Sequence, residues 1–160
     1  RGAYMDSRPD EEVVVAVDPG REKCGLAALT LDGRVVYKGI VAPDSVPEAV
    51  ASLLDSRRAD ALVIGDRTAM RDVMALLGEA LLSRFGSGVV AVDEHLSSVE
   101  ARSRYLDEHR PRGIARLIPK GMRTPPEPID DYAAVVLAER YLKTRYAKSC
   151  RPPEPDDTQN

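Results

Sequence analysis

The sequence is poor in the residues from which many kinds of site are built. It has two cysteines, two histidines, one phenylalanine and no tryptophan. Two cysteines cannot form a disulfide framework or a zinc site. Cys24 lies in an apolar stretch and Cys150 in a polar tail, so we expect both to be free thiols, which suits a cytoplasmic protein.

Long apolar runs and several familiar motifs are also missing. No apolar run approaches the roughly 18 residues that a membrane-spanning helix needs, and no signal-peptide pattern is present. The sequence contains neither a G-x-S-x-G serine-nucleophile motif nor a G-x-x-x-x-G-K-[ST] phosphate loop. We therefore expect no membrane partner, no serine hydrolase and no P-loop enzyme.

Basic residues are fewer than acidic ones overall, but many of them are concentrated in one region. The net charge of −3 argues against a protein that is basic over its whole surface. Acidic residues crowd the two ends, at 10–12 and 154–157. Between them, one stretch carries seven basic and only two acidic residues; the basic ones are Arg102, Arg104, Arg110, Arg112, Arg116, Lys120 and Arg123. We predict that this stretch binds nucleic-acid phosphates. The alternative is that it is only a solvated charged face followed by a loop.

Hydrophobic periodicity predicts a mixed α/β layout. Five consecutive small or β-branched residues before Asp18 indicate a strand that is buried on both faces. Residues 24–31 and 34–41 flank Asp32-Gly33, a strong hairpin signal, so the first three strands should form an antiparallel meander. The later segments should be helices at 45–58, 70–84, 97–106 and 129–146 and strands at 61–65 and 89–93. Ser45 and Glu48 match a capping box at the start of the first helix.

The later strands should run parallel to the first, because each returns through a helical crossover. We expect one domain over residues 13–148. Residues 1–12 are expected to be disordered or derived from a tag, and residues 149–160 to form a disordered acidic tail.

Acidic residues follow the predicted strands in a recurring pattern. Asp18 ends the first strand, Asp66 follows the fourth and Glu94 follows the last, while Asp130 and Asp131 begin the most apolar helix. In a sheet with parallel strands, ligands bind beyond the carboxyl ends of those strands. Converging carboxylates repel one another unless protons or cations compensate, and oxygen ligands suit Mg²⁺ or Mn²⁺.

Each of these acids also has an ordinary structural interpretation. Asp18 precedes Pro19-Gly20 and is suited to shaping a turn. Asp66 and either acid at 130–131 are suited to capping the helix that follows, and Glu94 to ending a strand in solvent. The residues alone leave these alternatives open.

Three strings in order carry a family resemblance. VAVDPGREKCGLAAL, VDEHLSSVEARSRYL and PIDDYAAVVLAERYL together resemble the YqgF (RuvX) family, relatives of the RuvC Holliday-junction resolvases. The resemblance extends from about Val13 to Leu142. It implies an RNase H-like fold: a five-stranded mixed sheet, its first three strands antiparallel, with helices on both faces.

The resemblance also implies a function and a site. The function is a divalent-metal-dependent nuclease acting on phosphodiester bonds in RNA, as in rRNA processing or RNA decay, or in branched DNA such as Holliday junctions. Its catalytic acids fall on Asp18, Glu94 and Asp130, which would hold one or two Mg²⁺ or Mn²⁺ ions, with Asp131 as a further metal ligand. The expected partner is nucleic acid, and the protein is expected to be a monomer or a homodimer.

The sequence departs from the family pattern at several positions. His95 follows Glu94 where arginine is usual, and Asp131 adds an acid beside Asp130. The segment at 65–69 lacks the usual G-L-P and resembles the G-N-G-T-A segment of the YqgF-like domain of the transcription factor Tex. The alternative function is therefore a non-catalytic nucleic-acid-binding module with the same fold. An actin-like ATPase would need a second comparable domain, for which 160 residues leave no room.

Overall fold

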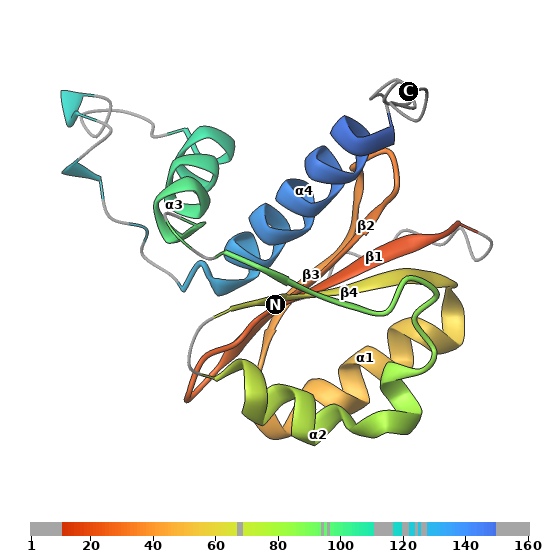
Figure 1. Ribbon diagram of the computed structural model, residues 1–160. Helices are drawn as coiled ribbons and strands as arrows, with labels where there is room; N and C mark the ends of the chain where they lie inside the picture. Colours follow the sequence, from red (N-terminus) through yellow and green to blue (C-terminus); the bar gives the residue numbers. More distant parts are fainter. Residues whose placement is uncertain are drawn as a thin grey trace, which may run out of the picture.

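The protein is a mixed sheet covered by helices on both faces (Figure 1). This computed structural model describes residues 11–66, 69–93, 95, 97–110, 117–119, 122–123, 125 and 128–149. In chain order the elements are β1 (Val13–Asp18), β2 (Cys24–Thr30), β3 (Val35–Val41), the 3₁₀ turn η1 (Pro43–Ser45), α1 (Val46–Ser56), β4 (Ala59–Gly65), α2 (Met70–Leu82), β5 (Val89–Val92), α3 (Ser97–Glu108) and α4 (Asp130–Ser149). No helix in these described ranges is long and apolar enough to cross a bilayer.

The sheet has five strands in the order β3-β2-β1-β4-β5. β1, β2 and β3 form the predicted antiparallel meander, and Gly33 turns the hairpin with a φ of 91°. β4 pairs parallel with β1, and β5 pairs parallel with β4. The topology predicted from the hairpin and the helical crossovers is confirmed, with β1 at the centre of the sheet.

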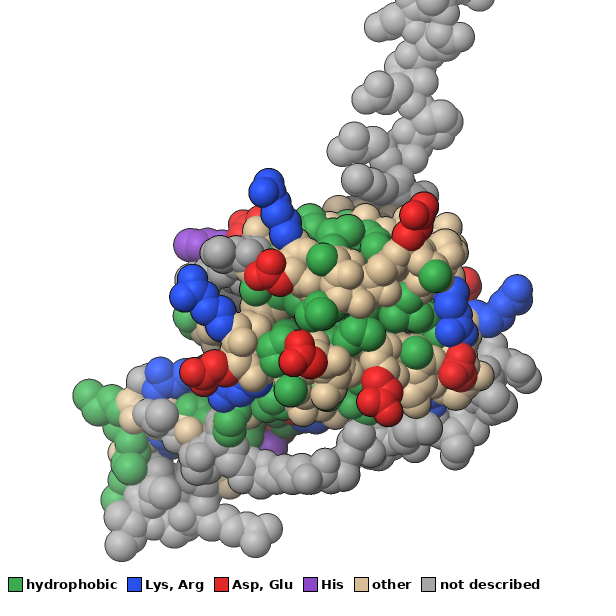
Figure 2. Space-filling model, turned by 90° about the horizontal axis from the view of Figure 1, so that it is seen from below, with side chains coloured by type: hydrophobic (Ala, Val, Ile, Leu, Met, Phe, Trp, Pro, Cys, Tyr) green, Lys and Arg blue, Asp and Glu red, His purple; other side chains and the backbone are tan. Residues whose placement is uncertain are grey.

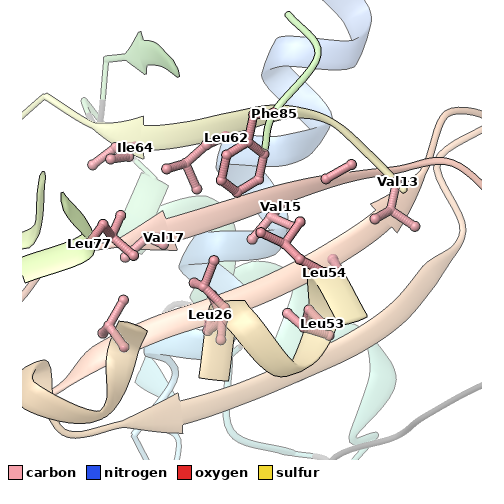
Figure 3. Close-up of a cluster of buried hydrophobic side chains, with 14 of the residues drawn as sticks. Val13, Val15, Val17, Leu26, Leu53, Leu54, Leu62, Ile64, Leu77 and Phe85 are labelled. Carbon is pink, nitrogen blue, oxygen red and sulfur yellow. The ribbon is translucent and has the colours of Figure 1, made fainter. Parts of the chain in front are cut away.

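Alternation along β1 assigns its side chains to two separate cores. Val13, Val15 and Val17 pack with α1 and α2, in the cluster drawn in Figure 3. Val14 and Ala16 pack with α4 on the opposite face. All five side chains are fully buried, which stabilises the fold by about 1.5–3 kcal/mol for each valine. The continuous apolar run in the sequence reflects this burial on both faces.

Two local predictions are wrong in detail. Ser45 makes no capping hydrogen bond, because η1 holds it at φ −90° and ψ −7°, whereas a capping side chain needs an extended backbone. Pro47 also follows at N1/N2 and supplies no N–H to cap. α2 ends at Leu82 rather than at residue 84, and it is interrupted at Gly78, whose φ is 70°.

α4 crosses the sheet on the face opposite α1 and α2 (Figure 1). Its residues from Tyr132 to Ala138 are all buried, as its unbroken apolar run predicts. The start of α4 comes so close to β2 at Gly25 that a Cβ there would collide with the carbonyl oxygen of Asp130. Glycine at position 25 is therefore what allows the helix to start at this place.

We expect Gly25→Ala to lower the free energy of unfolding by about 1–3 kcal/mol, because the added methyl group overpacks the contact between β2 and α4. Denaturant unfolding followed by circular dichroism measures this change. Gly86→Ala is the matched control: its Cβ would lie 3.7 Å from the nearest atom, the Asp60 carbonyl oxygen, an ordinary contact. Equal stabilities for the two variants would contradict the close approach at Gly25.

Candidate active site

Asp18 and Asp130 are brought together by the contact at Gly25. Asp18 is the last residue of β1 and is half-buried. By alternation it belongs to the face of β1 that carries Val14 and Ala16, which is the face covered by α4. Gly25 is its direct partner in the antiparallel register, and Gly25 also lies against the backbone of Asp130. The end of the central strand and the start of α4 therefore meet at one place.

Lys23 supplies positive charge to this place. Its Nζ lies 3.5 Å from Asp130 Oδ2, and the two side chains are 46% and 33% exposed. Neighbouring carboxylates destabilise one another when both are ionised, and a cation between or beside them offsets that repulsion. The site thus already holds one positive group against its acids.

Cys24 lies within electrostatic reach of both carboxylates. The thiol is buried, and burial is the main cause that raises its pKa. The negative charges of Asp18 and Asp130 raise the pKa further, because a thiolate is disfavoured beside other anions. One thiol is therefore within electrostatic reach of both acids.

Asp131 lies in a different environment from Asp130. Burial raises the pKa of Asp131, and the ammonium group of Lys38 on β3 acts in the opposite direction. Its Oδ1 accepts a hydrogen bond from the backbone N–H of Tyr132 at 3.0 Å. Consecutive helical residues point about 100° apart, so Asp130 pairs with Lys23 while Asp131 faces the Lys38 side.

Of the two remaining predicted acids, Asp66 lies in the described part of the chain. Asp66 follows β4 and is exposed, and its backbone N–H donates to the Val92 carbonyl at 3.1 Å. Alternation along β4 gives position 66 the side of Leu62 and Ile64, which face α1 and α2. Glu94 lies outside the described residues. Within the part of the chain that is described, no three His, Cys, Asp or Glu side chains are grouped to hold a metal ion.

Carboxylate oxygens at an open sheet edge are suitable ligands for Mg²⁺ or Mn²⁺. Asp18 and Asp130 supply such oxygens from two different elements, and the ammonium group of Lys23 at Asp130 shows that this position accommodates a cation. The chemistry of these two donors therefore fits a hard divalent ion.

The two basic residues of α3 that are predicted to bind phosphate, Arg102 and Arg104, have partners within the protein. Arg102 donates from Nε to the carbonyl of Arg123 at 3.0 Å. Arg104 pairs with Glu108 at 3.2 Å and with Glu139 on α4.

The other predicted phosphate-binding residues follow α3. Arg110 is exposed directly after α3, and Arg123 donates from Nε to the carbonyl of Ile118 at 2.7 Å. Arg112, Arg116 and Lys120 lie outside the described residues.

The face formed by α1 and α2 offers no comparable concentration of positive charge. Figure 2 shows acidic and basic side chains scattered among hydrophobic ones there, without a continuous basic area. Arg84 of this face pairs with Asp55 at 3.0 Å.

Sequence reasoning did not single out Lys23, Lys38 or Arg140. Lys38 lies over the Tyr132 ring, 3.4 Å from its centroid, and Arg140 binds the junction between β5 and α3. Each of these contacts joins segments that are distant in sequence, so no local pattern signals them. Of the three, only Lys23 has a signal in the sequence, because it lies in the turn that follows Asp18.

Residues 12–144 match the protein family described as RuvX: Holliday junction resolvase. The chain belongs to the RuvX family. A Burkholderia ambifaria protein named "Putative pre-16S rRNA nuclease" is 35% identical over 146 residues, covering 82% of this chain and 89% of that protein. A Xanthomonas euvesicatoria pv. vesicatoria protein of the same name is 32% identical over 148 residues, covering 84% and 89%. The family predicted from the three sequence strings is confirmed.

Solved structures support the same fold for this RuvX family member. Thermus thermophilus RuvC in complex with a Holliday junction substrate aligns with a TM-score of 0.52 at 19% identity, covering 86% of this chain and 96% of that one. A second Thermus thermophilus RuvC structure aligns with a TM-score of 0.50 at 18% identity, covering 84% and 96%. The five-stranded sheet and these neighbours confirm the RNase H-like α/β fold.

We expect Asp18→Asn to lower the pKa of the Cys24 thiol, because removing a nearby negative charge makes the thiolate easier to form. Thiolate absorbance near 240 nm, titrated in a Cys150→Ser background, measures this change. Asp55→Asn, which alters an exposed acid paired with Arg84, serves as the control. An unchanged Cys24 titration in Asp18→Asn would contradict the proximity of these two side chains.

Proposed function

We propose that this RuvX family member is a divalent-metal-dependent nuclease that hydrolyses phosphodiester bonds in structured RNA, with rRNA precursors as the first substrate to test. The observation that carries the proposal is the meeting of Asp18 and Asp130 at Gly25, beside the carboxyl end of the central strand. Nuclease activity itself is in keeping with the family and with the names of the relatives. We place the activity in the cytoplasm, which suits a buried free thiol at Cys24.

Asp18, Asp130 and Glu94 are the proposed ligands of one or two Mg²⁺ or Mn²⁺ ions. Bound metal ions of this kind activate a water molecule and neutralise charge on the leaving oxygen. The acids act by position and charge, since they hold the ions at a fixed place. Val92, two residues before Glu94, packs on the α4 face of the sheet, which is the face to which Asp18 belongs. Asp131, beside Lys38, is proposed to stay outside this ligand set.

Branched DNA is the second candidate substrate, because the family description names Holliday junction resolution. RNA comes first because the relatives that match over more than four-fifths of the chain are named for pre-16S rRNA. The alternative is a non-catalytic binding module with the same fold. In that case nucleic-acid binding would not depend on a metal ion and would persist when Asp18 is replaced.

The basic stretch is proposed to bind the phosphates of the substrate. Direct contacts are assigned to four residues that follow α3 in the chain, namely Arg110, Arg112, Arg116 and Lys120. Arg102, Arg104 and Arg123, which already have partners within the protein, are proposed to add positive potential rather than contacts.

Asp18→Asn is expected to reduce metal-dependent cleavage by about a hundredfold or more, because a ligand for the ions that stabilise the transition state is lost. Its free energy of unfolding should be unchanged or raised, since repulsion with Asp130 is relieved. Cleavage of end-labelled pre-rRNA fragments and of a four-way DNA junction is measured with Mn²⁺, Mg²⁺ or chelator.

Asp55→Asn is the matched control for this assay, because Asp55 is an exposed acid on α1 whose partner is Arg84. Cleavage that survives chelator, or that Asp18→Asn leaves intact, would refute the proposed chemistry. Binding of both nucleic acids without any cleavage would instead favour the binding module.

Arg110→Ala is expected to weaken RNA binding in chelator and to reduce the slope of log K against log salt by about one, because one phosphate contact is lost. Filter binding at several salt concentrations measures both quantities. Arg84→Ala, on the α1–α2 face, should leave them unchanged. The same slope in Arg110→Ala and wild type would rule out a phosphate contact at this residue.

A further inference from the structure

One guanidinium group of α4 holds the junction between β5 and α3. Arg140 Nη1 donates to the carbonyl of Asp93 at 2.6 Å. Its Nη2 donates to the carbonyl of His95 and to Glu100 Oε1, both at 2.8 Å. All three acceptors lie outside α4, and 23% of the arginine side chain is exposed.

This arrangement uses the particular geometry of arginine. A guanidinium group presents five N–H donors in a fixed fork, so a single side chain can bind two carbonyls and a carboxylate at once. Hydrogen bonds from a charged donor are also about twice as strong as neutral ones. A lysine at position 140 would keep the charge but could not reproduce the fork.

The junction has little else to hold it among the described residues. β5 is only four residues long and ends at Val92. Beyond it, the backbone N–H of His95 donates to Asp93 Oδ1 at 2.7 Å, a bond within the junction itself. The bonds from Arg140 connect this short segment to another element of the fold.

The same part of α4 also fixes α3. Glu100 and Arg104, one turn apart on α3, pair with Arg140 and Glu139 of α4 respectively. Below these ion pairs, Ala101 and Tyr105 belong to the buried cluster that joins the two helices. The junction and the helix after it are therefore held by α4 as one unit.

We propose that Arg140 is a positioning residue for the nuclease site. It fixes the backbone on both sides of Glu94, through Asp93 and His95, relative to the helix that carries Asp130. Arg140 is ten residues along α4 from Asp130, about 15 Å, so its contribution acts through the backbone of the junction. This inference rests on the proposed function, because it assigns Glu94 to the ligand set.

The test compares Arg140→Gln and Arg140→Lys with Arg84→Gln, which breaks an exposed arginine pair on the opposite face. Mn²⁺ affinity of the free protein is measured by calorimetry, and kcat and KM are measured on an RNA fragment. Hydrogen exchange of residues 93–100 monitors the junction directly, and thermal unfolding gives the folded fraction.

Both Arg140 variants should lose about 10- to 100-fold in Mn²⁺ affinity or kcat, as is typical when a residue that orients metal ligands is removed. KM should change less than twofold, and the amides of residues 93–100 should exchange faster. Glu100→Gln keeps both carbonyl bonds of Arg140, so its losses should be much smaller than those of Arg140→Gln.

The proposal is overturned if Arg140→Gln matches Arg84→Gln in Mn²⁺ affinity and kcat, or if Arg140→Lys restores both. It is equally overturned if the loss of activity follows the loss of folded protein. Wild-type protein that binds Mn²⁺ but cleaves neither nucleic acid would refute the nuclease. In that case the Mn²⁺ titration and the hydrogen exchange still decide the role of Arg140.

Discussion

The close approach of α4 to β2 at Gly25 is the contact on which the candidate site depends. Gly25 is paired in register with Asp18, and the space that a Cβ would occupy is taken by the carbonyl oxygen of Asp130. One residue without a side chain therefore allows the start of the helix to lie against β2, at the residue that pairs with the end of the central strand. Because the two acids belong to different elements, the position of Asp130 relative to Asp18 depends on this backbone contact.

α4 holds the rest of the fold in relation to that contact. Its buried middle packs against the sheet, and its later turns bind segments far apart in the sequence. Arg140 holds the junction after β5, and Arg145 pairs with the buried Asp60 near the start of β4. Contacts near both ends of α4 therefore join the helix to the sheet. A shift of α4 would move Asp130 and would also disturb the junction between β5 and α3 that Arg140 binds.

The charges around the site are arranged to tolerate acids that repel one another. Lys23 lies against Asp130, and Lys38 opposes the effect of burial on the pKa of Asp131. Each of the two neighbouring acids therefore has its own cation, on a different strand or turn. In the proposed nuclease, Asp130 binds metal together with Asp18, while Asp131 lies on the side of Lys38 and stays outside the ligand set.

The order of the elements, the antiparallel meander and the buried strands follow from the sequence, because apolar runs and hairpin signals depend on residues that are near one another in the chain. The sequence also indicated Asp18 and Asp130, but it could not separate Asp130 from Asp131. Their environments differ because α4 begins at Gly25 in one rotational setting, which long-range packing decides. The capping box predicted at Ser45 failed for a similar reason, since the preceding 3₁₀ turn fixed its backbone. The role inferred for Arg140 depends on contacts about 45 residues apart in the chain, and only the tertiary structure brings those groups together.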